Sequence, residues 1–110
     1  MARVAARIPD LLFGSKAAEL LRAAGHDVAL GGDPRDADVV VVDLTTGTID
    51  ESVVGAGAKV LGVFAHVEPE VRERALAAGY DQVVPRSRFM REGGALVERL
   101  ARPRPDSSPG

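Results

Sequence analysis

The sequence has no cysteine and no tryptophan, and aromatic residues make up only 4% of its 110 residues. Without cysteine the chain has no disulfide framework, no thiolate metal site and no thiol nucleophile, so side-chain burial must stabilise the fold. The few aromatic rings provide little material for a platform on which nucleic-acid bases could stack. We therefore expect an aliphatic, alanine-rich core and no nucleic-acid partner.

Long apolar runs are also missing. No segment approaches the roughly 18 apolar residues that a membrane-spanning helix requires. Arg3, Arg7 and Asp10 interrupt the N-terminal segment where a signal peptide would have its apolar stretch. The expectation is a cytoplasmic protein that does not associate with a membrane.

The composition is that of a globular domain. Hydrophobic residues contribute 45% and charged residues 27%, and the length suits one domain of the usual ~100–150 residues. Residues 102–110 contain three prolines and no other apolar side chain. We expect one folded domain over residues 1–101 and a disordered, proline-rich tail over 102–110.

Five short apolar runs predict β-strands. The clearest is 39–42, an uninterrupted run of valines that is typical of a strand buried on both faces. The predicted strands are 4–8, 28–30, 39–42, 60–65 and 82–84.

Helical patterns separate most of these runs. Apolar residues recur at helical spacing over 13–24 and 69–78, and each segment is followed by a glycine suited to end a helix. Glu68 would begin the second helix, with a proline in its first turn. A third helix is predicted after Ser87, which would cap it. The pair Gly93-Gly94 interrupts this last pattern, through close packing of a neighbour or a break in the helix.

Strands that alternate with helices through short connections form right-handed crossovers, and these produce a parallel sheet covered on both faces. The connection 31–37 is too short for a full helix, and 46–57 allows about two turns. The sequence therefore predicts a three-layer α/β fold with a five-stranded parallel sheet and thin cover on part of one face.

The carboxyl ends of parallel strands are where open α/β sheets place their ligand sites. An aspartate after a valine run needs solvent, a metal or a polar partner. Two interpretations of Asp43 are open: it pairs with Arg86, or it caps its own loop by accepting N–H bonds from Thr45 or Thr46. Polar residues that follow predicted strands are Asp10, Asp43, His66, Arg86 and Ser87.

Three segments resemble the receiver domains of two-component response regulators: VVVVDL at 39–44, VLGVFA at 60–65 and ALAAGYDQVVPRSRF at 75–89. The resemblance covers residues 3–101 and implies a CheY-like, flavodoxin-like fold with strand order 2-1-3-4-5. It places Asp43 on the phospho-acceptor aspartate of receivers and Arg86 close to their lysine.

The chain departs from the receiver pattern in its pocket. Receivers place two adjacent acids after the first strand to hold Mg²⁺, whereas only Asp10 stands there, and Phe64 or Ala65 replaces the hydroxyl after the fourth strand. Loss of one carboxylate weakens an oxygen-rich Mg²⁺ site. Arginine in place of lysine favours forked pairing with a carboxylate, so Arg86 is predicted to hold Asp43 in a permanent ion pair.

The resemblance, closest to a group of small bacterial receiver-like proteins without an output domain, implies a non-enzymatic signalling or adaptor domain. It would act through protein contacts as a monomer or weak homodimer. One alternative is a phosphorylatable regulator in which Asp10 and Asp43 bind Mg²⁺. The other is a sensor of a small anion or nucleotide, with the contacts Ser15, Lys16, Thr45, Thr46, His66 and Arg86. For Ser15 and Lys16, a plain surface pair explains the sequence equally.

Charge is unevenly distributed although the net charge is only −2. Residues 84–104 carry six arginines against two glutamates, a local charge of +4, whereas the first 44 residues carry five basic and seven acidic side chains. This pattern is typical of a solvated helix with a basic tail, or of a contact with an acidic partner. The predicted partner face comprises Tyr80, Arg88, Arg91 and Arg99.

Overall fold

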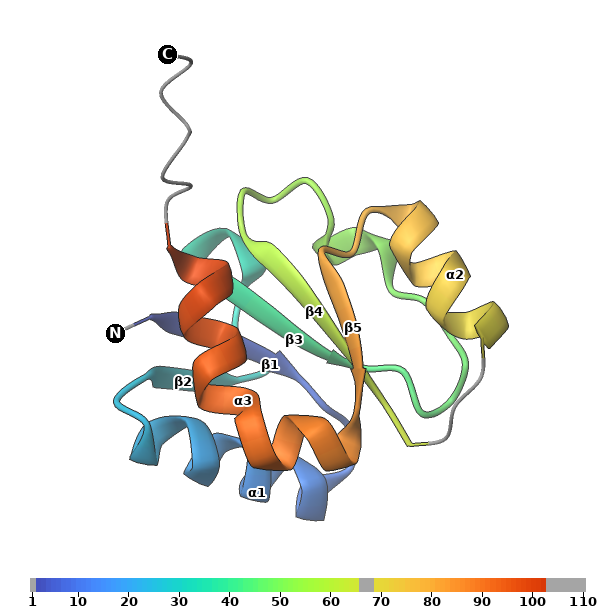
Figure 1. The fold of residues 1–110 in the computed structure, drawn as a ribbon. Helices are drawn as coiled ribbons and strands as arrows, with labels where there is room; N and C mark the ends of the chain where they lie inside the picture. The colour runs from blue at the N-terminus through green and yellow to red at the C-terminus, as the bar shows by residue number, and fades with distance from the viewer. Residues whose placement is uncertain (1, 66–68, 103–110) are drawn as a thin grey trace.

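The computed structural model describes residues 2–65 and 69–102. Its centre is a five-stranded sheet in the order β2-β1-β3-β4-β5, and every neighbouring pair of strands is parallel (Figure 1). The predicted fold class and strand order are confirmed. The strands are β1 (Arg3–Arg7), β2 (Asp27–Leu30), β3 (Val39–Asp43), β4 (Lys59–Phe64) and β5 (Gln82–Pro85).

In the described part of the chain, the strands are connected by α1 (Leu11–Ala23), η1 (Pro34–Asp36), η2 (Glu51–Val53) and α2 (Pro69–Ala78), of which η1 and η2 are short 3-10 segments. A third α-helix, α3 (Arg86–Ala101), follows β5. The expectation that 31–37 is too short for a full helix is confirmed, since this connection contains only the three-residue η1. The connection 46–57, which allows about two helical turns at most, contains the three-residue η2. His66, Glu68 and residues 103–110 lie outside the described residues, so the expectations for them stay predictions.

The valine run forms the middle strand because both faces of the sheet are covered there. Val39, Val40, Val41 and Val42 are at most 3% exposed. In the register of the sheet, Asp43 lies beside Val63 of β4. The run therefore carries Asp43 to the edge of the sheet at which all five parallel strands end.

The two faces have separate aliphatic cores. The α1 and α3 helices cover one face and α2 lies over the other (Figure 1). The first core centres on Phe13, Leu21, Val41, Phe89 and Leu96. The second centres on Val40, Leu44, Val53, Val71 and Tyr80.

The α3 helix is continuous through Gly93 and Gly94. A Cβ atom added at Gly94 would lie 2.6 Å from the Cβ of Ala24, at the end of α1. Of the two explanations for the glycine pair, close packing of a neighbour is therefore the right one.

The α3 helix begins one residue before the predicted cap. Its first residue is Arg86, its N-cap position is Pro85, and no side chain caps it. The prediction that Ser87 caps this helix is wrong, because the strand passes directly into the helix and Ser87 is already in its first turn. No helix in the described part of the chain is long and apolar enough to cross a membrane.

Candidate functional site

The first residue of α3 brings a guanidinium to the carboxyl end of the central strand. The Nη2 atom of Arg86 lies 3.3 Å from Oδ2 of Asp43 and 3.7 Å from Oδ2 of Asp10. The same nitrogen donates to the Thr45 hydroxyl over 3.2 Å. Side chains from two separate segments, one before α1 and one at the end of β3, therefore converge on the cation of α3.

Asp43 both pairs with Arg86 and caps its own loop, the two interactions that the sequence left open. Its Oδ1 atom accepts from the backbone N–H of Thr45 over 2.9 Å, and also from the Thr45 hydroxyl. Its Oδ2 atom accepts from Arg86. The side chain is only 6% exposed, so this carboxylate is buried, capped and paired at the same time.

Asp10 is divided between two tasks as well. Its Oδ1 atom accepts from the N–H groups of Leu12 and Phe13, at 3.0 and 3.2 Å, which makes Asp10 the N-cap of α1. A capping carboxylate also favours the positive end of the helix dipole. Only Oδ2 faces Arg86, because the cap of α1 engages Oδ1 and fixes the position of the carboxylate.

An aromatic ring supports the guanidinium from the core side. The Cζ atom of Arg86 lies 4.1 Å from the centre of the Phe13 ring, within the range of a cation–π interaction. The Nε atom of Arg86 is buried and has no hydrogen-bond partner among the described residues. Sequence reasoning missed Phe13, because its helical spacing marked it only as a core residue.

The donor set does not fit Mg²⁺. This ion prefers six oxygen ligands in octahedral geometry, and no cluster of three or more acids or histidines forms in the described part of the chain. The two available carboxylates each give one oxygen to backbone N–H groups, and Arg86 lies between their other oxygens. A second cation would meet a like charge there.

The structure brings together Asp10, Asp43, Thr45 and Arg86, and leaves other predicted residues apart. Ser87 is exposed, and no hydrogen bond joins it to those four residues. Ser15 and Lys16 are exposed on α1. Phe64, which replaces the receiver hydroxyl, is 7% exposed and packs in the second core.

Tyr80 corrects the predicted partner face. It is only 3% exposed, and its hydroxyl donates to the carbonyl oxygen of Asp50 over 2.9 Å. Burial raises the pKa of Tyr80 to about 12. The ring belongs to the second core, in one cluster with Val53, Val60 and Val83, and is not exposed to a partner.

The predicted arginines lie along α3, where one glutamate neutralises part of their charge. Arg88 and Arg91 both lie beside Glu92, at 3.6 and 3.7 Å. Arg99 is exposed, and no salt bridge to it occurs among the described residues. The surface formed by these three arginines therefore contains one paired acid, Glu92, and keeps a net positive charge.

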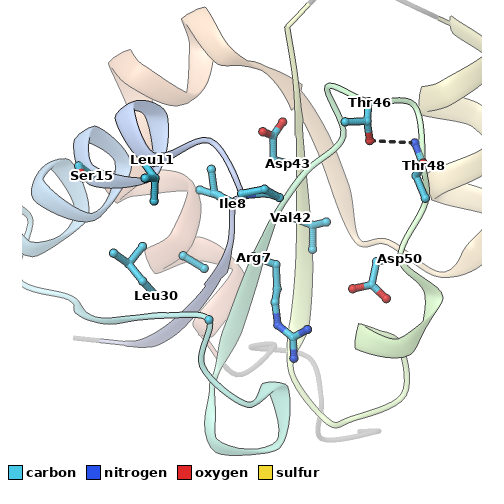
Figure 2. Close-up of a pocket in the computed structure, with 14 residues that line it drawn as sticks. Arg7, Ile8, Leu11, Ser15, Leu30, Val42, Asp43, Thr46, Thr48 and Asp50 are labelled. Carbon is cyan, nitrogen blue, oxygen red and sulfur yellow. Dashed lines mark hydrogen bonds between the residues drawn. The ribbon is translucent and has the colours of Figure 1, made fainter.

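A cleft of about 400 Å³ lies beside the Arg86 cluster. It crosses the carboxyl ends of β1, β2 and β3, and its walls include the start of α1 and the loop from Thr46 to Asp50 (Figure 2). Ser15 lines this cleft and Lys16 does not. Sequence reasoning missed Arg7 and Asp50 as cleft residues, since neither follows a motif.

No protein-family model and no curated protein matches this sequence. Solved structures do. The signal receiver domain of NarL from Mycobacterium tuberculosis matches 94% of this chain and 98% of that domain, with a TM-score of 0.73 and 21% identity. This chain has the receiver fold.

Two further receiver structures support the same conclusion. The Francisella response regulator 1452 receiver domain gives a TM-score of 0.74 at 17% identity, over 92% of this chain and 97% of the other. A response regulator receiver protein from Burkholderia phymatum gives 0.73 at 19% identity, over 92% and 95%. The expected likeness to receiver domains is confirmed for the fold.

Proposed function

We propose that this receiver-fold chain is a cytoplasmic, non-enzymatic signalling or adaptor domain that works through protein contacts without a phosphorylation switch. One observation carries the proposal: the Arg86 guanidinium is joined to Asp43 and Thr45, lies near Asp10, and stacks on Phe13. The phospho-acceptor position is thus held in an ion pair, and the domain keeps one conformation.

The chemistry of phosphoryl transfer explains why this pairing opposes a switch. Transfer needs an attacking oxygen in line with the phosphorus, and cations that neutralise the equatorial oxygens. In this chain the Oδ1 atom of Asp43 is a loop cap, and Oδ2 is paired with Arg86. An incoming phosphoryl group would therefore find both carboxylate oxygens engaged, the second by a guanidinium that Phe13 and Asp10 also hold in place.

The test is a titration of the isotope-labelled protein with MgCl₂ and beryllofluoride, followed by amide NMR. We expect the signals of Asp43, Thr45 and Arg86 to stay unchanged at millimolar Mg²⁺, and incubation with a small acyl phosphate to add no mass. Saturable shifts at these residues, absent from Asp43→Asn, would instead establish the phosphorylatable regulator.

The partner surface that we propose is the basic face of α3, formed by Arg88, Arg91 and Arg99. Because Arg88 and Arg91 share Glu92, the face retains a net positive charge and suits an acidic protein surface. Binding of the partner should weaken as the salt concentration rises, since exposed charges are screened over about 10 Å at 0.1 M salt.

Co-purification from the native cell tests this surface. The variant with glutamine at Arg88, Arg91 and Arg99 should lose proteins that the wild type retains at low salt. A matched control replaces three exposed arginines elsewhere: Arg3, Arg35 and Arg72. Equal recovery with both triple variants would show that α3 is not the contact.

A further inference from the structure

The cleft at the carboxyl ends of β1 and β3 lies at the point where the strand order reverses direction. In the order β2-β1-β3-β4-β5, the chain leaves β1 toward one edge for β2 and then returns to the other side with β3. Open α/β sheets bind small ligands in the crevice at this kind of point. The volume of about 400 Å³ is within the range of small-molecule sites.

One part of the cleft is apolar and exposed. Leu11 is 83% exposed and Leu30 is 53% exposed, although both are large aliphatic side chains. They and the partly buried Ile8 all line the cleft, and Figure 2 shows the two leucines on its α1 side, with Ile8 nearer to Asp43 than either leucine. Single exposed leucines are ordinary, whereas several around one concave site indicate a ligand.

The other part of the cleft contains two opposite charges that do not meet. Arg7 donates from Nε to the carbonyl oxygen of Gly32 over 3.3 Å, and Asp50 accepts through Oδ1 from Ser52. No salt bridge of 4.0 Å or less involves Arg7 or Asp50 within residues 2–65 and 69–102. Figure 2 shows both side chains on the same side of the cleft, away from the leucines.

The presence of both Arg7 and Asp50 in the cleft limits which charges a ligand can carry. A simple anion would meet the carboxylate of Asp50, and a simple cation would meet the guanidinium of Arg7. A head group that carries both charges would satisfy both residues, and an attached aliphatic chain would cover Leu11 and Leu30. Asp43 also lines the cleft, but its carboxylate is already paired with Arg86.

We propose that the cleft binds a small aliphatic zwitterion of the α-amino-acid class. Its carboxylate would pair with Arg7, its ammonium group with Asp50, and its side chain would lie against Ile8, Leu11 and Leu30. The site does not depend on phosphorylation of Asp43 or on the basic face of α3, so it can be tested separately from the proposed function.

The experiment is an amide NMR titration of the full chain with L-leucine and with two analogues of similar size. Isocaproate lacks the ammonium group, and isoamylamine lacks the carboxylate. We expect L-leucine to shift the signals of Arg7, Ile8, Leu30 and Asp50 saturably, and each analogue to bind at least about tenfold more weakly, because each loses one charge-assisted contact.

Variants then assign the two charges. Asp50→Asn keeps a side chain able to cap η2 and should weaken L-leucine binding about tenfold or more, as should Arg7→Gln, whereas Arg7→Lys should retain part of the affinity. The matched controls are Glu73→Gln and Arg72→Gln, which remove exposed charges on α2. Circular dichroism confirms that each variant is folded.

The proposal would be overturned by the absence of a saturable shift with L-leucine at tens of millimolar, or by equal binding of L-leucine and both analogues. Shifts confined to residues outside the cleft would overturn it too. Tighter binding of L-glutamate than of L-leucine would also contradict it, since the apolar part of the cleft would then have no role.

Discussion

Arg86 at the start of α3 and Phe13 in the first turns of α1 are in contact, with the guanidinium carbon 4.1 Å from the ring centre. Phe13 also meets Phe89 edge-on, with ring centres 6.1 Å apart. The contact holds the Arg86 guanidinium beside Asp43 and joins α1 and α3, the two helices that cover one face of the sheet. A flexible lysine would not provide this planar stacking.

Removing the charge of Asp43 should weaken the fold. Asp43→Asn leaves a half-buried guanidinium without its nearest counter-charge, so we expect the free energy of unfolding in urea to fall by about 1–3 kcal/mol. Glu73→Gln, at an exposed position, is the control and should change it by less than about 0.5 kcal/mol. Unchanged or higher stability of Asp43→Asn would indicate an acceptor relieved of crowded negative charge.

The two roles of Asp10 can be separated by substitution. Asp10→Asn keeps an oxygen for the N–H groups of Leu12 and Phe13 and removes the charge, whereas Asp10→Ala removes both. We expect the alanine variant to lose about 0.5–2 kcal/mol of stability and the asparagine variant clearly less. Equal losses, measured by chemical denaturation, would mean that the ion pair with Arg86 outweighs the cap.

Tyr80 should make the fold sensitive to alkaline pH. Its pKa is about 12 in the folded chain and about 10 when unfolded, so the folded state favours the neutral phenol. The stabilisation is complete below about pH 10 and is lost as the pH rises through about 12. The Tyr80→Phe variant should lack this decline, apart from the titration of other groups.

Urea unfolding of both proteins between about pH 8 and pH 11 tests the prediction. Near pH 8, Tyr80→Phe should be less stable by about 1 kcal/mol, because the hydrogen bond to the carbonyl of Asp50 is lost. Parallel pH profiles for the two proteins would show that the phenol does not contribute to the alkaline decline.

The contact between α1 and α3 requires a glycine at position 94. A methyl group there would lie 2.6 Å from the Cβ of Ala24, so Gly94→Ala should destabilise the fold by about 1–3 kcal/mol, although alanine favours helix by about 1 kcal/mol. Thermal unfolding measures the change. The double variant Gly94→Ala with Ala24→Gly should recover part of the loss; no recovery would place the strain elsewhere.

The sequence by itself determined the layers of this fold. The four valines at 39–42 are typical of a central strand buried on both faces, and the connection 31–37 is too short for a full helix, so the parallel sheet and its thin cover follow from local pattern. The prediction that Ser87 caps the last helix was wrong by two positions, because Pro85 is the N-cap and makes no side-chain hydrogen bond. No local sequence signal encodes this direct passage from strand to helix.

Only the tertiary structure decided what the charged residues do. Asp10, Asp43 and Arg86 were predicted to be near one another, but only the packing of α3 against α1 placed the Arg86 guanidinium over Phe13. The backbone N–H groups that the two carboxylates cap are local, two or three residues further along the chain. Packing in the second core buried Tyr80, and the fold placed Arg7 and Asp50 in one cleft without a salt bridge to any described residue. Periodicity reports which side chains are buried, whereas the pairing of distant charges depends on how the elements pack in three dimensions.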